Sequence, residues 1–131
     1  SSLELYLEIK DGLIEGDFNT ITGKMNNLST IIKSWVPELT EGSSPLELLS
    51  QTAQTLAGST DITTSRTSFV AFSHLYIDFM KGLNRDDVLF VQFCPMANEG
   101  KSAYWLSLEQ EIKNPYYGMM MLRCGETIER I

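Results

Sequence analysis

The apolar stripe of residues 18–35 constrains the fold of this chain more than any other feature of its sequence. Its large apolar side chains recur at alternating steps of three and four residues: Phe18, Ile21, Met25, Leu28, Ile32 and Trp35. Because an α-helix turns once in about 3.6 residues, this spacing places all six side chains on one face. Pro37 ends the pattern, since its ring excludes the preceding residue from helical geometry. The stripe predicts an amphipathic helix that must pack against a core.

Three more segments repeat this helical period and carry recognisable end signals. They cover residues 3–15, 44–58 and 61–83. Gly16 ends the first helix and Asp17 can cap the next, so this loop is very short and the two helices should pack antiparallel. Residues 38–43 are polar and predict a longer loop. Ser44 and Asp61 suit the N-cap positions of the last two helices.

Residues 88–93 break the helical pattern. β-Branched and aromatic residues dominate this segment, which predicts a short strand. The methionine-rich segment 119–123 can form a second strand that pairs with it. We therefore expect a mostly α fold: an up-and-down four-helix bundle (residues 1–84) with a short C-terminal β-like cassette bearing Cys and Met (residues 85–131). A length of 131 residues and a hydrophobic content of 43% suit a single domain, 1–131, with one core.

The charge balance restricts the partners of the chain. Acidic residues outnumber basic residues by 17 to 10, which gives a net charge of −7. Nucleic acid is bound by neutralising phosphates with Lys and Arg, so no nucleic-acid partner is expected, and anionic membranes are disfavoured. No run approaches the roughly 20 apolar residues of a spanning helix, so no transmembrane segment is expected. No signal peptide is visible, and we expect a mature or trimmed form.

Four sulfur-bearing residues form the candidate site: Cys94, Met96, Met121 and Cys124. Thiolate and thioether ligands select soft ions, above all Cu(I). In an extended segment, Cys94 and Met96 project to the same face, which would let them share an ion. Alternatively, the two cysteines form a disulfide that closes a loop of about 30 residues, or all four side chains fill the core. The spacing contains no C-x-x-C and does not match a zinc site.

Catalysis is not expected from this sequence. His74 is the only histidine, so any Ser-His-Asp or Cys-His mechanism must use it. No G-x-S-x-G nucleophile motif, phosphate loop or cofactor fingerprint is present. His74 can ligate a metal or be oriented by Asp78, and the alternative is a partly exposed structural histidine. The sequence therefore predicts a non-enzymatic domain.

Four motifs near the C-terminus carry a family resemblance. In order they are C-P-M-A (94–97), G-K-S-A-Y-W-L-S (100–107), E-I-K-N-P-Y-Y-G (111–118) and M-L-R-C-G (121–125). With Tyr6 to Asp17 and the segment R-T-S-F-V-A-F-S upstream, they make most of the chain resemble a bacterial domain-of-unknown-function family, number 3347. That family occurs alone in secreted proteins and fused to periplasmic adaptor proteins of copper and silver efflux systems. His74, Met119 and Met120 lie outside its pattern.

The resemblance implies a periplasmic or envelope location, heavy-metal handling and a periplasmic efflux component as partner. The matching positions are Cys94, Met96, Trp105, Asn114, Pro115, Tyr116, Gly118, Met121 and Cys124. We therefore expect a non-enzymatic envelope domain that binds Cu(I) or Ag(I) through Cys94, Met96, Met121 and Cys124. The alternative is a structural or protein-interaction module in which the two cysteines are disulfide-bonded or buried.

Overall fold

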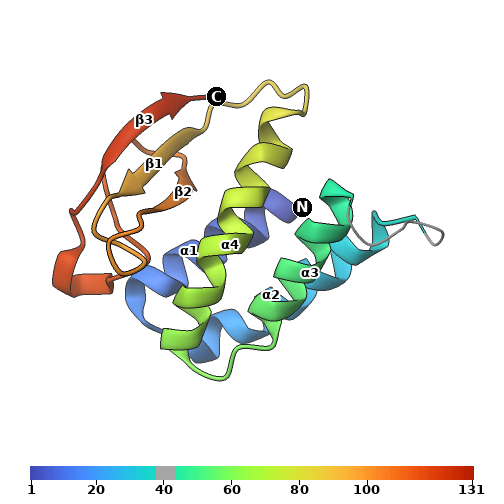
Figure 1. Cartoon of the computed structure of the whole chain (residues 1–131), viewed down its shortest axis with the longest axis horizontal. Helices are drawn as coiled ribbons and strands as arrows, with labels where there is room; N and C mark the ends of the chain where they lie inside the picture. Colours follow the sequence, from blue (N-terminus) through green and yellow to red (C-terminus); the bar gives the residue numbers. More distant parts are fainter. Residues whose placement is uncertain (38–43) are drawn as a thin grey trace.

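Four helices precede a small sheet in the computed structural model, which describes residues 1–37 and 44–131 (Figure 1). The helices are α1 (Ser2–Glu15), α2 (Phe18–Ser34), α3 (Pro45–Ala57) and α4 (Ile62–Lys81). The strands are β1 (Phe90–Cys94), β2 (Ala103–Ser107) and β3 (Glu126–Arg130), with the 3-10 helix η1 (Gly118–Met121) before β3. Among the described residues the fold is mostly α, which confirms the coarse prediction. The loop predicted at residues 38–43 lies outside the described residues.

The helix ends follow the predicted signals. Gly16 adopts a left-handed conformation, φ 75°, which ends α1 and turns the chain at once into α2. The side chains of Asp17, Ser44 and Asp61 each accept a hydrogen bond from a backbone N–H in the first turn of the following helix. Only the end of α4 differs: the helical segment predicted to run to residue 83 stops at Lys81, and Leu83 is 44% exposed.

The predicted apolar stripes form the core. The four central residues of the α2 stripe are buried, namely Ile21, Met25, Leu28 and Ile32. Its two ends are only partly buried, and the Trp35 ring stacks on Phe79 with ring centroids 5.1 Å apart. The prediction of a buried Trp35 is therefore only half right, because α2 ends at Ser34 and leaves Trp35 at the rim of the core.

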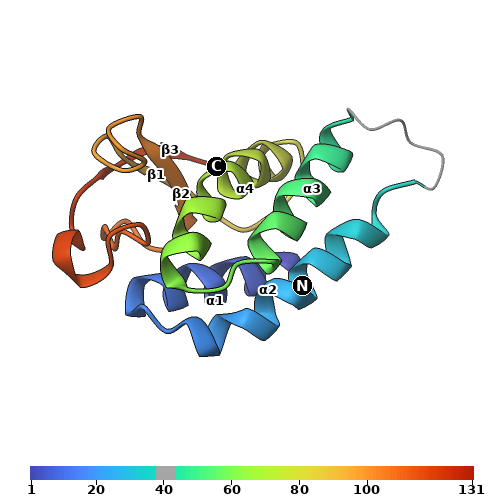
Figure 2. The ribbon, with the colours of Figure 1, turned by 60° about the horizontal axis from the view of Figure 1, so that its bottom comes forward.

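Each helix packs against the next in sequence, and the sheet packs beside α4 and α1. Contacts join α1 to α2, α2 to α3 and α3 to α4, whereas the backbones of α1 and α4 are farther apart and meet through large side chains such as Tyr6 and Tyr76. β2 contacts both α4 and α1. In Figure 1 the sheet lies on one side of α4 and α3 on the other, and Figure 2 shows α1 and α2 forming a layer below α3 and α4.

One buried tyrosine joins this assembly. Tyr6 of α1 is fully buried, its hydroxyl lies 2.6 Å from the Ser73 hydroxyl of α4, and it accepts a hydrogen bond from the Leu106 N–H of β2 at 3.0 Å. Burial raises the pKa of Tyr6 above its ordinary value. A single hydroxyl therefore connects three elements that are far apart in the sequence.

The sheet is antiparallel, in the order β2-β1-β3, and aromatic side chains pack on both faces of its β1–β2 part, whereas the residues of β3 are exposed. On one face the Tyr104 ring lies against Phe93 and against His74 of α4. On the other face Trp105 packs edge-on against Tyr116, from the segment between β2 and β3.

We call residues 1–84 the helical region and residues 85–131 the C-terminal region.

The predicted strand at 88–93 is confirmed as β1, which begins two residues later and ends one residue later than predicted. The predicted strand at 119–123 is wrong: Met119 to Met121 belong to η1. Gly118, with φ 59°, begins this turn, and the methionine side chains that follow are exposed and make no ladder. The strands that pair with β1 are β2 and β3, and the sequence analysis predicts no strand at either position.

Candidate functional site

The two cysteines meet at one end of the sheet. Cys94 is the last residue of β1 and is fully buried, and Cys124 lies between η1 and β3 and is partly exposed. Their Sγ atoms are 2.7 Å apart, and both residues are free thiols. We call them the thiol pair. The structure therefore brings together two of the four predicted site residues from positions 30 apart in the sequence.

A buried asparagine fixes the backbone of Cys124. Asn114 is fully buried, and its Nδ2 donates to the Cys124 carbonyl at 2.9 Å. Its Oδ1 accepts from the Tyr116 N–H at 2.8 Å, and its own N–H donates to the Leu122 carbonyl at 2.7 Å. Because side chain and backbone of Asn114 are both engaged, this one residue holds the turn that carries Cys124.

A glycine allows the chain after Cys124 to approach β1. Gly125 has φ 140°, and a Cβ on it would lie 2.5 Å from the Phe93 carbonyl oxygen and 3.0 Å from the Trp105 ring. No other residue fits this space without a shift of the backbone. Gly125 thus sets the distance between the turn and β1, and with it the separation of the two sulfurs.

A buried polar network lies on the same strand as Cys94, two residues before it. Gln92 of β1 is fully buried, and its Oε1 accepts from the indole N–H of Trp105 at 2.8 Å. Its Nε2 donates to the Glu109 carbonyl at 2.8 Å and to the Thr127 hydroxyl at 3.1 Å. The side chain therefore joins all three strands to the segment that follows β2, and satisfies its own buried polar atoms.

Tyr117 and Met96 form the rim of the thiol pair. The Tyr117 hydroxyl donates to the Met96 carbonyl. Desolvation raises the pKa of Tyr117, and electrostatic interaction with the neighbouring thiol pair adds to this. The pKa of Cys124 is also raised, first by its hydrogen bond with Cys94, whereas the Met96 N–H beside its sulfur opposes the shift. Cys124 therefore favours its protonated form in this arrangement.

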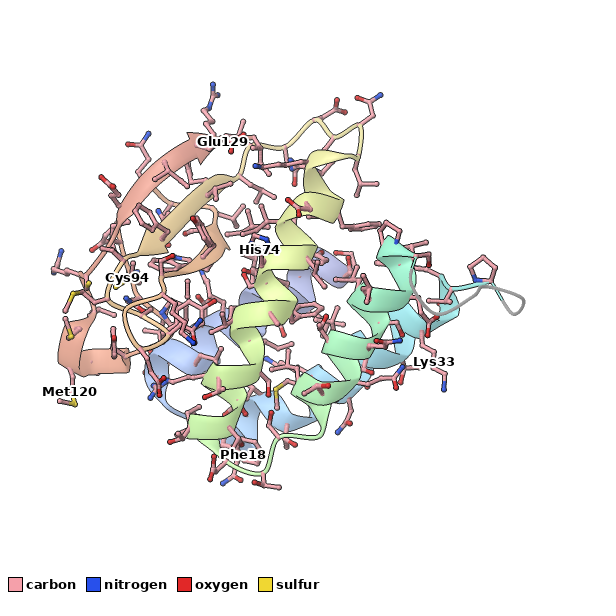
Figure 3. The ribbon with its side chains drawn as sticks, in the orientation of Figure 1. Phe18, Lys33, His74, Cys94, Met120 and Glu129 are labelled. Carbon is pink, nitrogen blue, oxygen red and sulfur yellow. The ribbon has the colours of Figure 1, made fainter. Side chains whose placement is uncertain are left out.

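The methionines lie at the surface. The exposed fractions are 58% for Met96 and 38% for Met121, with 74% for Met119 and 92% for Met120. The backbones of Met96 and Met121 do adjoin Cys124: the Cys124 N–H donates to the Met121 carbonyl at 3.1 Å. Figure 3 shows Met120 at the outer edge of the molecule, directed away from Cys94. The four predicted ligands thus share one neighbourhood, with their thioethers on its solvent side.

His74 stands apart from this site. It is exposed on α4, where its ring lies 6.0 Å from Tyr104, centroid to centroid. Within residues 1–37 and 44–131 it makes no hydrogen bond with Asp78, and no three His, Cys, Asp or Glu side chains gather closely enough to hold a metal ion. A metal at the thiol pair would therefore depend on the thioether ligands.

Sequence reasoning missed Gln92, Asn114 and Gly125 as the residues that build the site, although the family resemblance included Asn114. A buried Gln or Asn carries no periodic signal, and its partners here are backbone groups of distant segments. Arg66 is a further residue of this kind, and the only local sign of it is a charged residue one turn before Phe69 on the apolar face of α4. Its Nη2 donates to the Leu13 carbonyl at 2.6 Å and its Nε to the Pro115 carbonyl at 3.1 Å, which joins the end of α1 to the turn before η1.

Comparisons with known proteins add no relative. No family model matches this chain, and neither a curated protein nor a solved structure matches it. The resemblance to the domain-of-unknown-function family therefore stays a prediction. In the part of the chain that the structure describes, none of the helices has the length and apolar character needed to span a bilayer.

Proposed function

We propose that this chain is a non-enzymatic domain of the bacterial envelope whose thiol pair closes as a disulfide, and which acts as a structural or protein-interaction module. The observation that carries the proposal is the 2.7 Å separation of the Cys94 and Cys124 sulfurs. A disulfide bond measures about 2.05 Å, so closing it takes a movement of only about 0.7 Å. Disulfides persist in oxidising compartments such as the periplasm, which agrees with the location that the resemblance implies.

The separation of the sulfurs favours a disulfide over a metal ion held between them. A thiolate binds a metal such as Zn²⁺ at about 2.3 Å, so two thiolates on one tetrahedral ion lie about 3.8 Å apart. The thiol pair, at 2.7 Å, must open by about 1 Å to admit an ion. It need not open to form a disulfide.

Thiol counting and peptide mapping on unreduced protein test this proposal. After mild oxidation we expect no free thiol in denaturant, and a cross-linked peptide that contains Cys94 and Cys124. The Cys94→Ser and Cys124→Ser variants provide the controls, since each should retain one free thiol. Two free thiols in oxidised wild-type protein would refute the proposal.

Binding of Cu(I) or Ag(I) is the second candidate function. The observation that favours it is the position of Met96 and Met121, whose backbone groups both adjoin Cys124. Rotation of these exposed side chains can bring thioether sulfurs towards the reduced thiol pair, giving the soft donor set that Cu(I) prefers. Such a domain would pass its ion to a periplasmic efflux component by ligand exchange.

A Cu(I) titration of reduced protein against a competing chelator tests this second candidate. We expect Cys94→Ser and Cys124→Ser each to lower the affinity at least tenfold, and Met121→Leu to lower it severalfold. Met120→Leu is the matched control, because Met120 lies in the same turn and points outward. Equal affinity in wild type and both serine variants would end this candidate.

The helix order supports an up-and-down bundle as the support of the site. Each helix contacts its neighbours in sequence, β2 contacts both α1 and α4, and α1 meets α4 through large side chains such as Tyr6, whose ring stacks on Tyr76. We infer that the sheet covers the side of the bundle between α1 and α4 and presents the thiol pair at one end.

A further inference from the structure

The two sulfurs of the thiol pair differ in access to solvent. Cys94 has no exposed surface, because it ends the central strand β1 and lies opposite Ala103 of β2. Cys124 is partly exposed, in the turn that follows η1. A thiolate that attacks a disulfide must reach one sulfur from solvent, since the reaction passes through a mixed disulfide with that sulfur.

We propose that thiol–disulfide exchange with a cysteine-bearing partner protein enters this domain at Cys124, with Cys94 as the leaving sulfur. The inference rests on the proposed disulfide. It adds the sulfur that is attacked, the direction of the exchange and the chemical class of the partner, which is a protein with an exposed dithiol.

The reaction balances without any further reagent. One thiolate of the partner attacks Cys124 Sγ, the Cys94–Cys124 bond breaks, and Cys94 leaves as a thiolate that takes up a proton. The second thiolate of the partner attacks the partner's own sulfur in the mixed disulfide and releases Cys124, which takes up a second proton. This domain gains two electrons and two protons, and the dithiol of the partner becomes a disulfide.

The surface around Cys124 favours a protein partner over a small thiol. Four exposed methionines lie on the two chain segments that adjoin Cys124, all of them more than a third exposed, and we call them the methionine collar: Met96, Met119, Met120 and Met121. Methionine is flexible and polarisable, so such a surface adapts to apolar partner surfaces. Because the Cys124 N–H bonds to Met121, a partner that docks on the collar brings its own cysteine close to Cys124.

The asymmetry also has a structural basis that survives opening of the disulfide. Asn114 holds the Cys124 carbonyl, and Cys94 is held in the ladder of β1. After the bond breaks, each sulfur remains on its own fixed backbone, Cys94 buried at the end of the sheet and Cys124 at the surface. Reoxidation of this domain therefore joins the same two sulfur atoms again.

Trapping of the mixed disulfide tests the proposal directly. Oxidised wild-type protein is mixed with a thioredoxin-fold reductase whose second active-site cysteine is replaced by serine, and the adduct is digested and mapped. We expect the adduct at Cys124. An adduct at Cys94 would overturn the assignment.

Single-cysteine variants supply an independent readout that does not require the native disulfide. With an aromatic disulfide reagent, folded Cys94→Ser, which retains Cys124, should react at least tenfold faster than folded Cys124→Ser, which retains Cys94. In denaturant the two rates should become equal, which separates access from intrinsic reactivity. Equal rates in the folded state would overturn the proposal. If wild type forms no disulfide while this difference in rate persists, the proposed function fails and the access asymmetry stands.

The methionine collar has its own control. In Cys94→Ser, adding Met119→Gln and Met120→Gln should lower the rate with oxidised thioredoxin-fold protein severalfold and leave the rate with oxidised glutathione unchanged. An equal change in both rates would show that the collar does not select a protein partner. Both substitutions lie at exposed positions and should leave folding intact.

Discussion

The helical region and the C-terminal region are held together by different means. In the helical region, apolar side chains repeat along each helix and bury one against another, as Ile21, Met25 and Leu28 do along α2. In the C-terminal region, single buried polar side chains bind backbone groups of distant segments, as Gln92 and Asn114 do. The first arrangement distributes its stability over many similar contacts, and the second concentrates it in a few.

This difference explains where the site lies. Packing of a periodic apolar face covers a core, but it does not fix the position of any single backbone group. Two sulfurs come within bonding distance only when the backbone that carries each of them is held in place. The bonds of Asn114 to Cys124 and the close approach at Gly125 do fix such positions. The region with less regular structure therefore holds the more exact geometry.

The largest expected effect separates the two tryptophans. Trp105 in β2 is fully buried and bonded to Gln92, so Trp105→Ala should cost about 3–5 kcal/mol of unfolding free energy. Trp35→Ala should cost clearly less, since Trp35 is only partly buried at the rim of the helical core. Urea unfolding of the two variants measures both values. Equal losses would contradict the distinction between an interior and a rim position.

A smaller loss of unfolding free energy is expected when the side chain of Asn114 is removed. Asn114→Ala removes the bonds to the Cys124 carbonyl and the Tyr116 N–H and leaves both groups without their partner, which should cost about 1–3 kcal/mol. The variant should also react faster with thiol reagents, because the turn that bears Cys124 is released. Urea unfolding and a thiol-labelling rate measure the two effects. Unchanged stability together with an unchanged labelling rate would show that Asn114 does not position Cys124.

The smallest effect concerns pH. Burial raises the pKa of Tyr76 in α4 from its ordinary value of 10.0 to about 12, and burial also raises that of Tyr116 in the C-terminal region. The folded state thus keeps a phenol proton that the unfolded chain loses, so this contribution is complete below pH 10 and is lost as pH rises towards 12. The Tyr76→Phe variant should therefore lose less unfolding free energy than wild type as the pH rises from 10 to 12. Urea midpoints measured from pH 9 to 12 test this, and a constant midpoint in wild type would contradict it.

The sequence was a good guide wherever structure depends on near neighbours. The α2 stripe and the caps Asp17, Ser44 and Asp61 predict helices because their signals lie within one or two turns. It failed for β3, whose five exposed residues have no apolar alternation, and whose pairing with β1 is set by chain 30 or more residues away. The composition of the methionine-rich segment 119–123 predicts a strand, which is wrong because local composition does not reveal the turn that Gly118 begins.

The candidate site was predicted in part. Cys94 and Cys124 were chosen as a pair from their chemistry, and the structure brings them together. Their supports were not visible, because Gln92, Asn114 and Gly125 act through backbone groups whose positions exist only in the folded chain. The exposure of Met96 and Met121 was not predictable either, because methionine is equally common in cores.

The most direct test of the central claim is the difference in unfolding free energy between oxidised and reduced protein, measured in urea. Closing the loop between Cys94 and Cys124, which are 30 residues apart, should make the oxidised form about 3–4 kcal/mol more stable. The unfolding free energy of the Cys94→Ser variant should be the same with and without reductant. Identical stability of oxidised and reduced wild type, with both thiols still free after oxidation, would contradict the account.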